Sequence, residues 1–138
     1  MAIIKEFRAL RPKKDFVSKV AELPYDVVTT EEARTAAQLN PYSFFHITRP
    51  EVNLPIEYNP YTHDVYKKGK ENLHKFIHEG ILHYDDKEYL YLYTLRMGNH
   101  KQTGIVAVVS IDDYIHNIVK KHELTREDKE IDRMNHIN

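Results

Sequence analysis

The feature that most constrains the fold is a pair of β-rich segments joined by a short polar turn. Residues 88–97 and 102–111 are rich in aromatic and β-branched side chains, which favour strands. The connection between them is Gly98, Asn99, His100 and Lys101, so the sequence predicts an antiparallel hairpin. Because other segments carry helical patterns, we expect an α+β fold in which a mixed, largely antiparallel sheet with a central hairpin is flanked by helices.

Capping signals predict where the helices begin. In three capping boxes, a hydroxyl and a carboxylate three residues later can satisfy the free N–H groups of a first turn. These pairs are Thr29 with Glu32, Ser110 with Asp113, and Thr125 with Asp128. The first predicts a helix over 30–39, the second a short helix, and the third a helix that runs to the chain end. A longer helix is predicted over 60–79, with Asn59 as its cap, Pro60 at its first position and Gly80 at its end.

Extended segments are expected between these helices. Residues 3–10 predict a first strand, and residues 27–28 a short extended piece. Residues 43–48 combine aromatic and β-branched side chains and predict a further strand. No repeat or flexible linker interrupts the chain of 138 residues, so a single domain is expected.

The amino-acid composition indicates the cellular compartment in which the chain is expected to fold. Hydrophobic residues make up 41% and charged residues 30%, which is too apolar for a disordered tail and too interrupted by charge for a membrane span. The absence of cysteine excludes disulfides and thiolate zinc sites. Charges at Lys5, Glu6 and Arg8 argue against a signal peptide. We therefore expect a cytoplasmic protein that does not contact membranes.

The charge balance argues against nucleic acid as a partner. The chain has 20 basic and 21 acidic side chains, for a formal net charge of -1. A balanced charge supplies no overall attraction to a phosphate backbone. Direct nucleic-acid binding is therefore not expected.

Two common ligand motifs are absent from the sequence. The four glycines lack the close spacing of phosphate-binding loops of the P-loop and dinucleotide types. His74 and His78 lie one helical turn apart and can bind one metal ion together, but they stand at the edge of the apolar helix face, where half-exposed histidines are common. The sequence therefore predicts no metal site.

The densest cluster of functional side chains lies at residues 120–133. A helix N-terminus attracts anions, and Arg126, Lys129 and Arg133 repeat on one helical face near that end. This arrangement suits phosphate, with His122 or Glu123 as a general base for a substrate hydroxyl. The structural alternative is a solvated, capped helix with ion pairs, and spacing alone favours it.

A second candidate segment covers residues 40–51. His46 and Arg49 follow aromatic residues near the end of a predicted strand, where polar side chains often line pockets. The alternative is that His46 is a hydrogen-bonded core histidine and that Glu51 is an ion-pair partner of Arg49. Spacing alone favours this alternative.

The last helix carries apolar residues that need cover. Ile131, Met134 and Ile137 share one helical face, and no later element of this sequence can bury them. We expect the chain to be part of a longer protein. The alternatives are packing onto earlier elements or onto a neighbouring subunit of a homo-oligomer.

Several of these segments resemble Domain of Unknown Function family 1015. The similarity runs along nearly the whole chain and appears in the same order. The segments that carry it are Phe-Arg-Ala-Leu-Arg-Pro at 7–12, Pro-Tyr-Asp-Val-Val at 24–28, Asn-Pro-Tyr-Ser-Phe at 40–44 with His46 and Arg49-Pro-Glu51, and Lys-His-Glu-Leu-Thr at 121–125 with Lys129 and Asp132-Arg133.

The resemblance implies more than these residues show by themselves. Family members are much longer and carry a later Asp-Gly-His-His-Arg-Tyr motif, which this sequence lacks. That motif is similar to one of the ParB and sulfiredoxin fold, which includes free-serine kinases. By this resemblance the chain is the amino-terminal segment of a nucleotide-dependent enzyme, such as a kinase of a small hydroxyl-bearing metabolite. It is expected to be inactive without the missing carboxy-terminal part.

The resemblance also implies site roles and a cofactor. Glu123 and His122 are the expected catalytic residues. The expected phosphate- or substrate-binding residues are Thr125, Lys129, Arg133, His46, Arg49, Tyr25 and Asp26. The residues alone identify no cofactor, and the resemblance implies ATP or another nucleotide with Mg²⁺ in the longer protein. The alternative function is a nucleotide-responsive regulatory or partner-binding module without catalysis.

Overall fold

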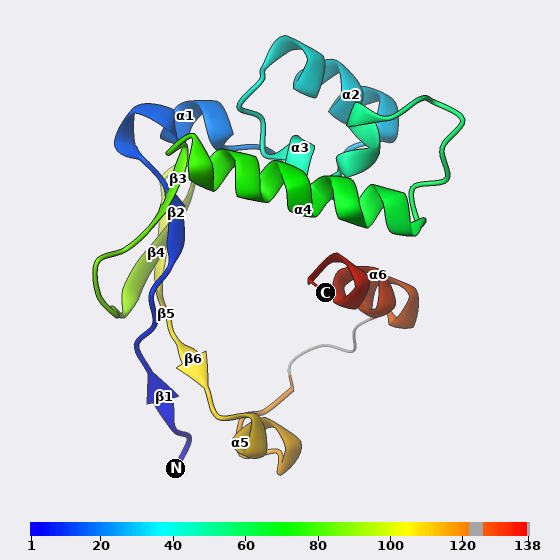
Figure 1. The fold of residues 1–138 in the computed structure, drawn as a ribbon. Helices are drawn as coiled ribbons and strands as arrows, with labels where there is room; N and C mark the ends of the chain where they lie inside the picture. The colour runs from blue at the N-terminus through cyan, green and yellow to red at the C-terminus, as the bar shows by residue number, and fades with distance from the viewer. Residues whose placement is uncertain (122–125, 138) are drawn as a thin grey trace. The chain divides into compact units, whose positions relative to one another are not determined.

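The computed structural model describes residues 1–121 and 126–137 (Figure 1). It contains helices and small antiparallel two-stranded sheets, which confirms the predicted α+β class. The described chain divides into two units. Unit 1 comprises residues 1–11 and 84–121, and unit 2 comprises residues 12–83 and 126–137. Strands β2 (Leu10–Pro12) and β3 (Leu82–Tyr84) contain the boundaries between them.

Unit 1 contains the predicted hairpin. Strand β4 (Tyr91–Met97) pairs antiparallel with β5 (His100–Val106), and Met97 faces His100 across a two-residue turn. Gly98 opens the turn with φ 57°, a conformation that favours glycine. The hairpin is confirmed, although β4 begins three residues later than predicted. Its second arm ends earlier, and a separate strand β6 (Val108–Val109) pairs antiparallel with β1 (Ile4–Lys5).

The first predicted strand is therefore only partly correct. Residues 3–10 do not form one continuous strand, since β1 ends at Lys5 and β2 begins at Leu10. The short helix α5 (Ile111–Ile115) follows β6, and the Ser110 hydroxyl accepts a hydrogen bond from the Asp113 N–H as predicted. The Asp113 carboxylate instead accepts from the Ile3 N–H at 2.7 Å. The capping box at this helix is therefore half formed.

Unit 2 has its core around α2 (Thr30–Leu39). The predicted capping box is present: the Glu32 N–H donates to Thr29 Oγ1, and the Thr29 N–H donates to Glu32 Oε2. Small residues on the inner face of this helix allow close packing. The buried cluster is Ala33, Ala37, Phe45 and Val52. The 3-10 turn η1 (Lys14–Phe16) and the short helix α1 (Val17–Val20) precede it in sequence.

The strand predicted over residues 43–48 is wrong, because this segment contains helix α3 (Phe45–Thr48). Local side-chain hydrogen bonds explain the difference. Asn40 Oδ1 accepts from the Tyr42 N–H, and the fully buried Ser43 hydroxyl accepts from the Phe45 N–H. These bonds turn the chain into a helix despite its β propensity. The predicted extended piece at 27–28 is also absent, since these residues form a bend.

The long helix is α4 (His63–His78), with Thr62 as its N-cap, so the predicted start at Pro60 is wrong. Asn59 Oδ1 accepts from the Tyr61 N–H and forms a turn before the helix. The predicted end is confirmed. Gly80 takes φ 68°, and the Ile81 N–H donates to the Phe76 carbonyl in a Schellman arrangement.

A close approach at Gly69 sets how unit 2 packs. A Cβ at this position would lie 2.7 Å from Pro50 Cγ and 3.1 Å from the Ile47 carbonyl oxygen. Pro50 begins the 3-10 turn η2 (Pro50–Asn53), which follows α3. Because glycine has no Cβ, α3 and η2 can pack tightly onto α4.

The last helix, α6 (Glu127–Ile137), turns its polar face inward. Asp132 is buried, whereas the expected apolar seam of Ile131, Met134 and Ile137 is exposed by 47%, 52% and 84%. The alternative that earlier elements bury this seam is therefore wrong for unit 2. Inward polar side chains place α6 at the site described below. No helix in the described part of the chain is both long and apolar enough to span a membrane.

Candidate functional site

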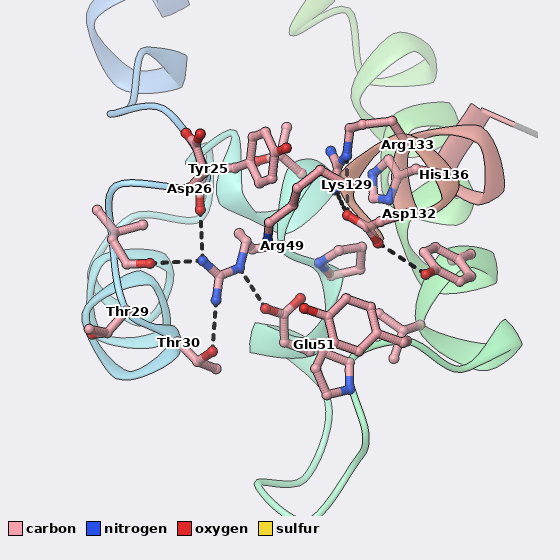
Figure 2. Close-up of a pocket in the computed structure, with 17 residues that line it drawn as sticks. Tyr25, Asp26, Thr29, Thr30, Arg49, Glu51, Lys129, Asp132, Arg133 and His136 are labelled. Carbon is pink, nitrogen blue, oxygen red and sulfur yellow. Dashed lines mark hydrogen bonds and ion pairs between the residues drawn. The ribbon is translucent and has the colours of Figure 1, made fainter. Parts of the chain in front are cut away.

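A pocket of about 290 Å³ lies within unit 2 (Figure 2). Its wall comes from the segment before α2, the α3–η2 junction, the start of α4, and α6. The polar and charged residues labelled in Figure 2 are Tyr25, Asp26, Thr29, Thr30, Arg49, Glu51, Lys129, Asp132, Arg133 and His136. The volume suits a phosphate group or a compact metabolite, since it is at the lower end for ligand pockets.

Arg49 holds one wall of the pocket together. Its Nη1 donates to the carbonyls of Tyr25 at 2.8 Å and Val28 at 3.0 Å, and its Nη2 donates to Thr30 Oγ1 at 2.7 Å. Figure 2 shows these bonds converging on the guanidinium from the segment that leads into α2. Most donors of this side chain are therefore used within the protein, and Arg49 positions the wall rather than offering an open cation.

The Nε group of Arg49 forms an ion pair with Glu51. Nε lies 2.6 Å from Glu51 Oε1, and the two side chains are only 15% and 7% exposed. A buried carboxylate of this kind needs its charged partner, because an unpaired charge is costly away from water. The ion pair that the sequence offered as the structural alternative for Arg49 is present.

Arg133 lies on the opposite wall and is fixed from two sides. Its guanidinium carbon stands 4.0 Å from the centre of the Tyr25 ring, a cation–π contact. Both Nη2 and Nε of Arg133 donate to Asp132 Oδ2, at 2.6 Å and 3.2 Å respectively. Nη1 makes no hydrogen bond to any described residue. Arg133 is thus oriented in the pocket with part of its fork available for an anion.

Asp132 is the buried carboxylate that holds Arg133 in this wall. Its Oδ1 accepts from the Tyr66 hydroxyl at 3.0 Å, and its Oδ2 accepts from Arg133. Burial acts to raise the pKa of Asp132, but the hydrogen bonds from Arg133 and Tyr66 outweigh it, so the pKa lies below its usual value. Asp132 is therefore ionised near neutral pH.

His136 lies one turn farther along α6. Its Nε2 is 2.7 Å from the Ile47 carbonyl oxygen, so this nitrogen carries a proton and donates it. Burial lowers the pKa of His136 more than its hydrogen bond to Ile47 raises it. The ring is therefore neutral near pH 7, and its Nδ1 is an acceptor.

Lys129 supplies the open positive charge of the pocket. It is half-buried on the same face of α6 as Arg133, and no described residue forms an ion pair with it. Asp26, also in the lining, is exposed. Since Arg49 and Arg133 are each paired with a carboxylate, Lys129 is the lining cation whose charge is not balanced by a described partner.

The structure brings together five of the residues that the sequence singled out: Tyr25, Asp26, Arg49, Lys129 and Arg133. His46 is not in the lining. Its ring nitrogens face Asn53 Oδ1 at 2.7 Å and the Asn40 carbonyl at 3.1 Å, as expected for the hydrogen-bonded alternative. His122, Glu123 and Thr125 lie outside the described residues, as does the cap expected at Thr125.

Sequence reasoning missed Tyr66, Asp132 and His136 as lining residues. A signal was present, since Asp132 and His136 are four residues apart and share a helical face with Lys129. An apolar seam ordinarily indicates the inner face of a helix, whereas the seam of α6 is exposed. Within residues 1–121 and 126–137, no group of three or more His, Cys, Asp or Glu side chains is arranged to hold a metal ion.

The comparison with protein families covers this whole arrangement. Residues 4–138 match the family described as Protein of unknown function (DUF1015). The chain belongs to the DUF1015 family. Every residue of the pocket lies within the part of this DUF1015 chain that matches. No curated protein and no solved structure matches it.

Proposed function

We propose that unit 2 of this DUF1015 chain binds the phosphate group of a small molecule in the pocket. The observation that carries the proposal is the pairing pattern of the lining. Arg49 and Arg133 are held by Glu51 and Asp132, whereas Lys129 has no described ion-pair partner. A lysine on a polar wall, four residues from a fixed arginine, suits an anion with several oxygens.

We further propose that the site serves a nucleotide-dependent enzyme that phosphorylates a small hydroxyl-bearing metabolite, with ATP and Mg²⁺ as the expected cofactors. The resemblance to family members implies a later motif similar to that of the ParB and sulfiredoxin fold and its free-serine kinases, and the proposal rests on this implication. In this proposal His122 or Glu123, which precede α6 in sequence, orients or deprotonates the acceptor hydroxyl. The second candidate is a nucleotide-responsive regulatory module, which is favoured if binding occurs without turnover.

Calorimetric titration with inorganic phosphate and with ATP tests the binding proposal. Lys129→Ala should weaken the binding of both by about tenfold or more, because one charge-assisted contact is lost. Lys75→Ala is the matched control, since Lys75 is an exposed lysine of α4 in the same unit and outside the pocket lining. Equal affinities in the parent and Lys129→Ala proteins, both folded by circular dichroism, would contradict the proposal.

A phosphate-transfer assay with the longer protein that the resemblance implies distinguishes the enzyme from the regulatory module. Glu123→Gln should leave ATP affinity nearly unchanged and abolish phosphate transfer to the acceptor if Glu123 is the base. ATP binding with no transfer to any hydroxyl-bearing acceptor in the parent protein would favour the regulatory module.

A further inference from the structure

A second hollow runs between α4 and α6 in unit 2, and we call it the α4–α6 groove. Its volume of about 750 Å³ is well above that of the pocket. Apolar side chains line much of it, namely Ile47, Leu73 and Ile137. Gly69 also lies in its wall, so the backbone of α4 is approached closely there. The groove is large enough for one or two rings of an organic molecule.

The groove and the pocket share a wall. Tyr61, Tyr66 and His136 line both. The rings of Tyr66 and His136 meet edge to face, with centroids 6.0 Å apart and planes at 89°. Each is anchored, because Tyr66 donates to Asp132 and His136 donates to the Ile47 carbonyl. The pocket and the groove are therefore neighbouring hollows.

The lining of the groove also indicates what it can accept. Its described lining residues include no Asp or Glu, and Lys67 is an exposed lysine among them. A largely apolar surface of this kind suits the apolar or aromatic part of a ligand, and it does not repel an anion.

We propose that the α4–α6 groove holds the ring-bearing organic body of a phosphate monoester whose phosphate lies in the pocket. The inference rests on the proposed function, because the position of the phosphate comes from that proposal. The pocket has room for the phosphate and the groove for the rings, and the two hollows are neighbours that share Tyr61, Tyr66 and His136. Selectivity for the organic body is then set by the groove, and anion binding by Lys129 and Arg133.

Three ligands of increasing ring size test this division: inorganic phosphate, phenyl phosphate and naphthyl phosphate. In calorimetric titrations naphthyl phosphate should bind at least about tenfold more tightly than inorganic phosphate, because burying ring surface adds to the affinity. Leu73→Ser should remove most of that gain and leave inorganic phosphate binding unchanged. Leu39→Ser is the matched control, since Leu39 is 82% exposed in the same unit and outside the groove lining.

A second variant keeps the test valid if Leu73→Ser fails to fold. Leu73 is half-buried, whereas His74 is exposed in the groove wall, so His74→Ala is expected to fold. This variant should weaken the binding of naphthyl phosphate by a smaller factor than Leu73→Ser does, about two- to threefold. If the three ligands bind equally, with a phosphate affinity that still depends on Lys129, the inference is overturned while the proposed function stands. If none of them binds, both are overturned.

Discussion

Replacing Arg49 by alanine should destabilise unit 2 strongly. The change removes one member of a nearly buried ion pair and leaves the Glu51 carboxylate, 7% exposed, without its partner. It also leaves the carbonyls of Tyr25 and Val28 without their donor. Breaking a buried pair from one side costs about 3–5 kcal/mol. This is a large part of the roughly 5–15 kcal/mol that stabilises a typical domain.

Arg49→Lys separates charge from geometry. Lysine keeps the positive charge near Glu51, but its single ammonium cannot reach all the acceptors that the guanidinium fork reaches. We therefore expect a smaller loss, about 1–3 kcal/mol, from the acceptors left unsatisfied. Arg126→Ala is the matched control. Arg126 also pairs with a carboxylate, that of Asp128, but their side chains are 74% and 59% exposed, so little change is expected.

Urea titration measures these differences. Because the chain has no tryptophan and 10 tyrosines, circular dichroism and tyrosine fluorescence are suitable probes. Coincident transitions would support the use of one free energy of unfolding. If Arg49→Ala unfolds at the same urea concentration as Arg126→Ala, Arg49 does not hold the pocket wall together.

Two further predictions concern packing and pH. Gly69→Val should lower the urea midpoint. Valine gains less than about 0.5 kcal/mol of helix propensity over glycine, but its overpacking against Pro50 costs about 1–3 kcal/mol. A raised midpoint would argue against the close approach at Gly69. Since the pKa of folded His136 lies below its unfolded value of about 6.5, its contribution to stability is complete above that pH and is lost as the pH falls toward the folded pKa. His136→Gln should flatten the decline of the free energy of unfolding in this window, and an unchanged slope would show that His136 does not titrate as described.

The elements that the sequence predicted well are those determined by neighbouring residues. The start of α2 follows from Thr29 and Glu32, and the hairpin turn follows from Gly98. The segment containing α3 was misjudged because β propensity is a weak preference that local hydrogen bonds can override. There the buried Ser43 and the side chain of Asn40 decide the backbone.

The pocket was only partly predictable for a different reason. The sequence marks Lys129 and Arg133 as one basic face, but the side of α6 that turns inward is decided by contacts distant in sequence. These are the Tyr66 hydroxyl on Asp132 and the Ile47 carbonyl on His136. An apolar seam ordinarily indicates the buried face, and in α6 that rule gives the wrong side.

Nuclear magnetic resonance titration of the isotopically labelled chain with inorganic phosphate tests the central claim most directly. The Nε–H signal of Arg133 reports on the pocket wall, and the backbone amides of Tyr25 and Lys129 report on the segments that face it. We expect saturable shifts at these three residues, which Lys129→Ala weakens and Lys75→Ala leaves unchanged. Shifts confined to residues outside the pocket, or no saturable shift at all, would contradict it.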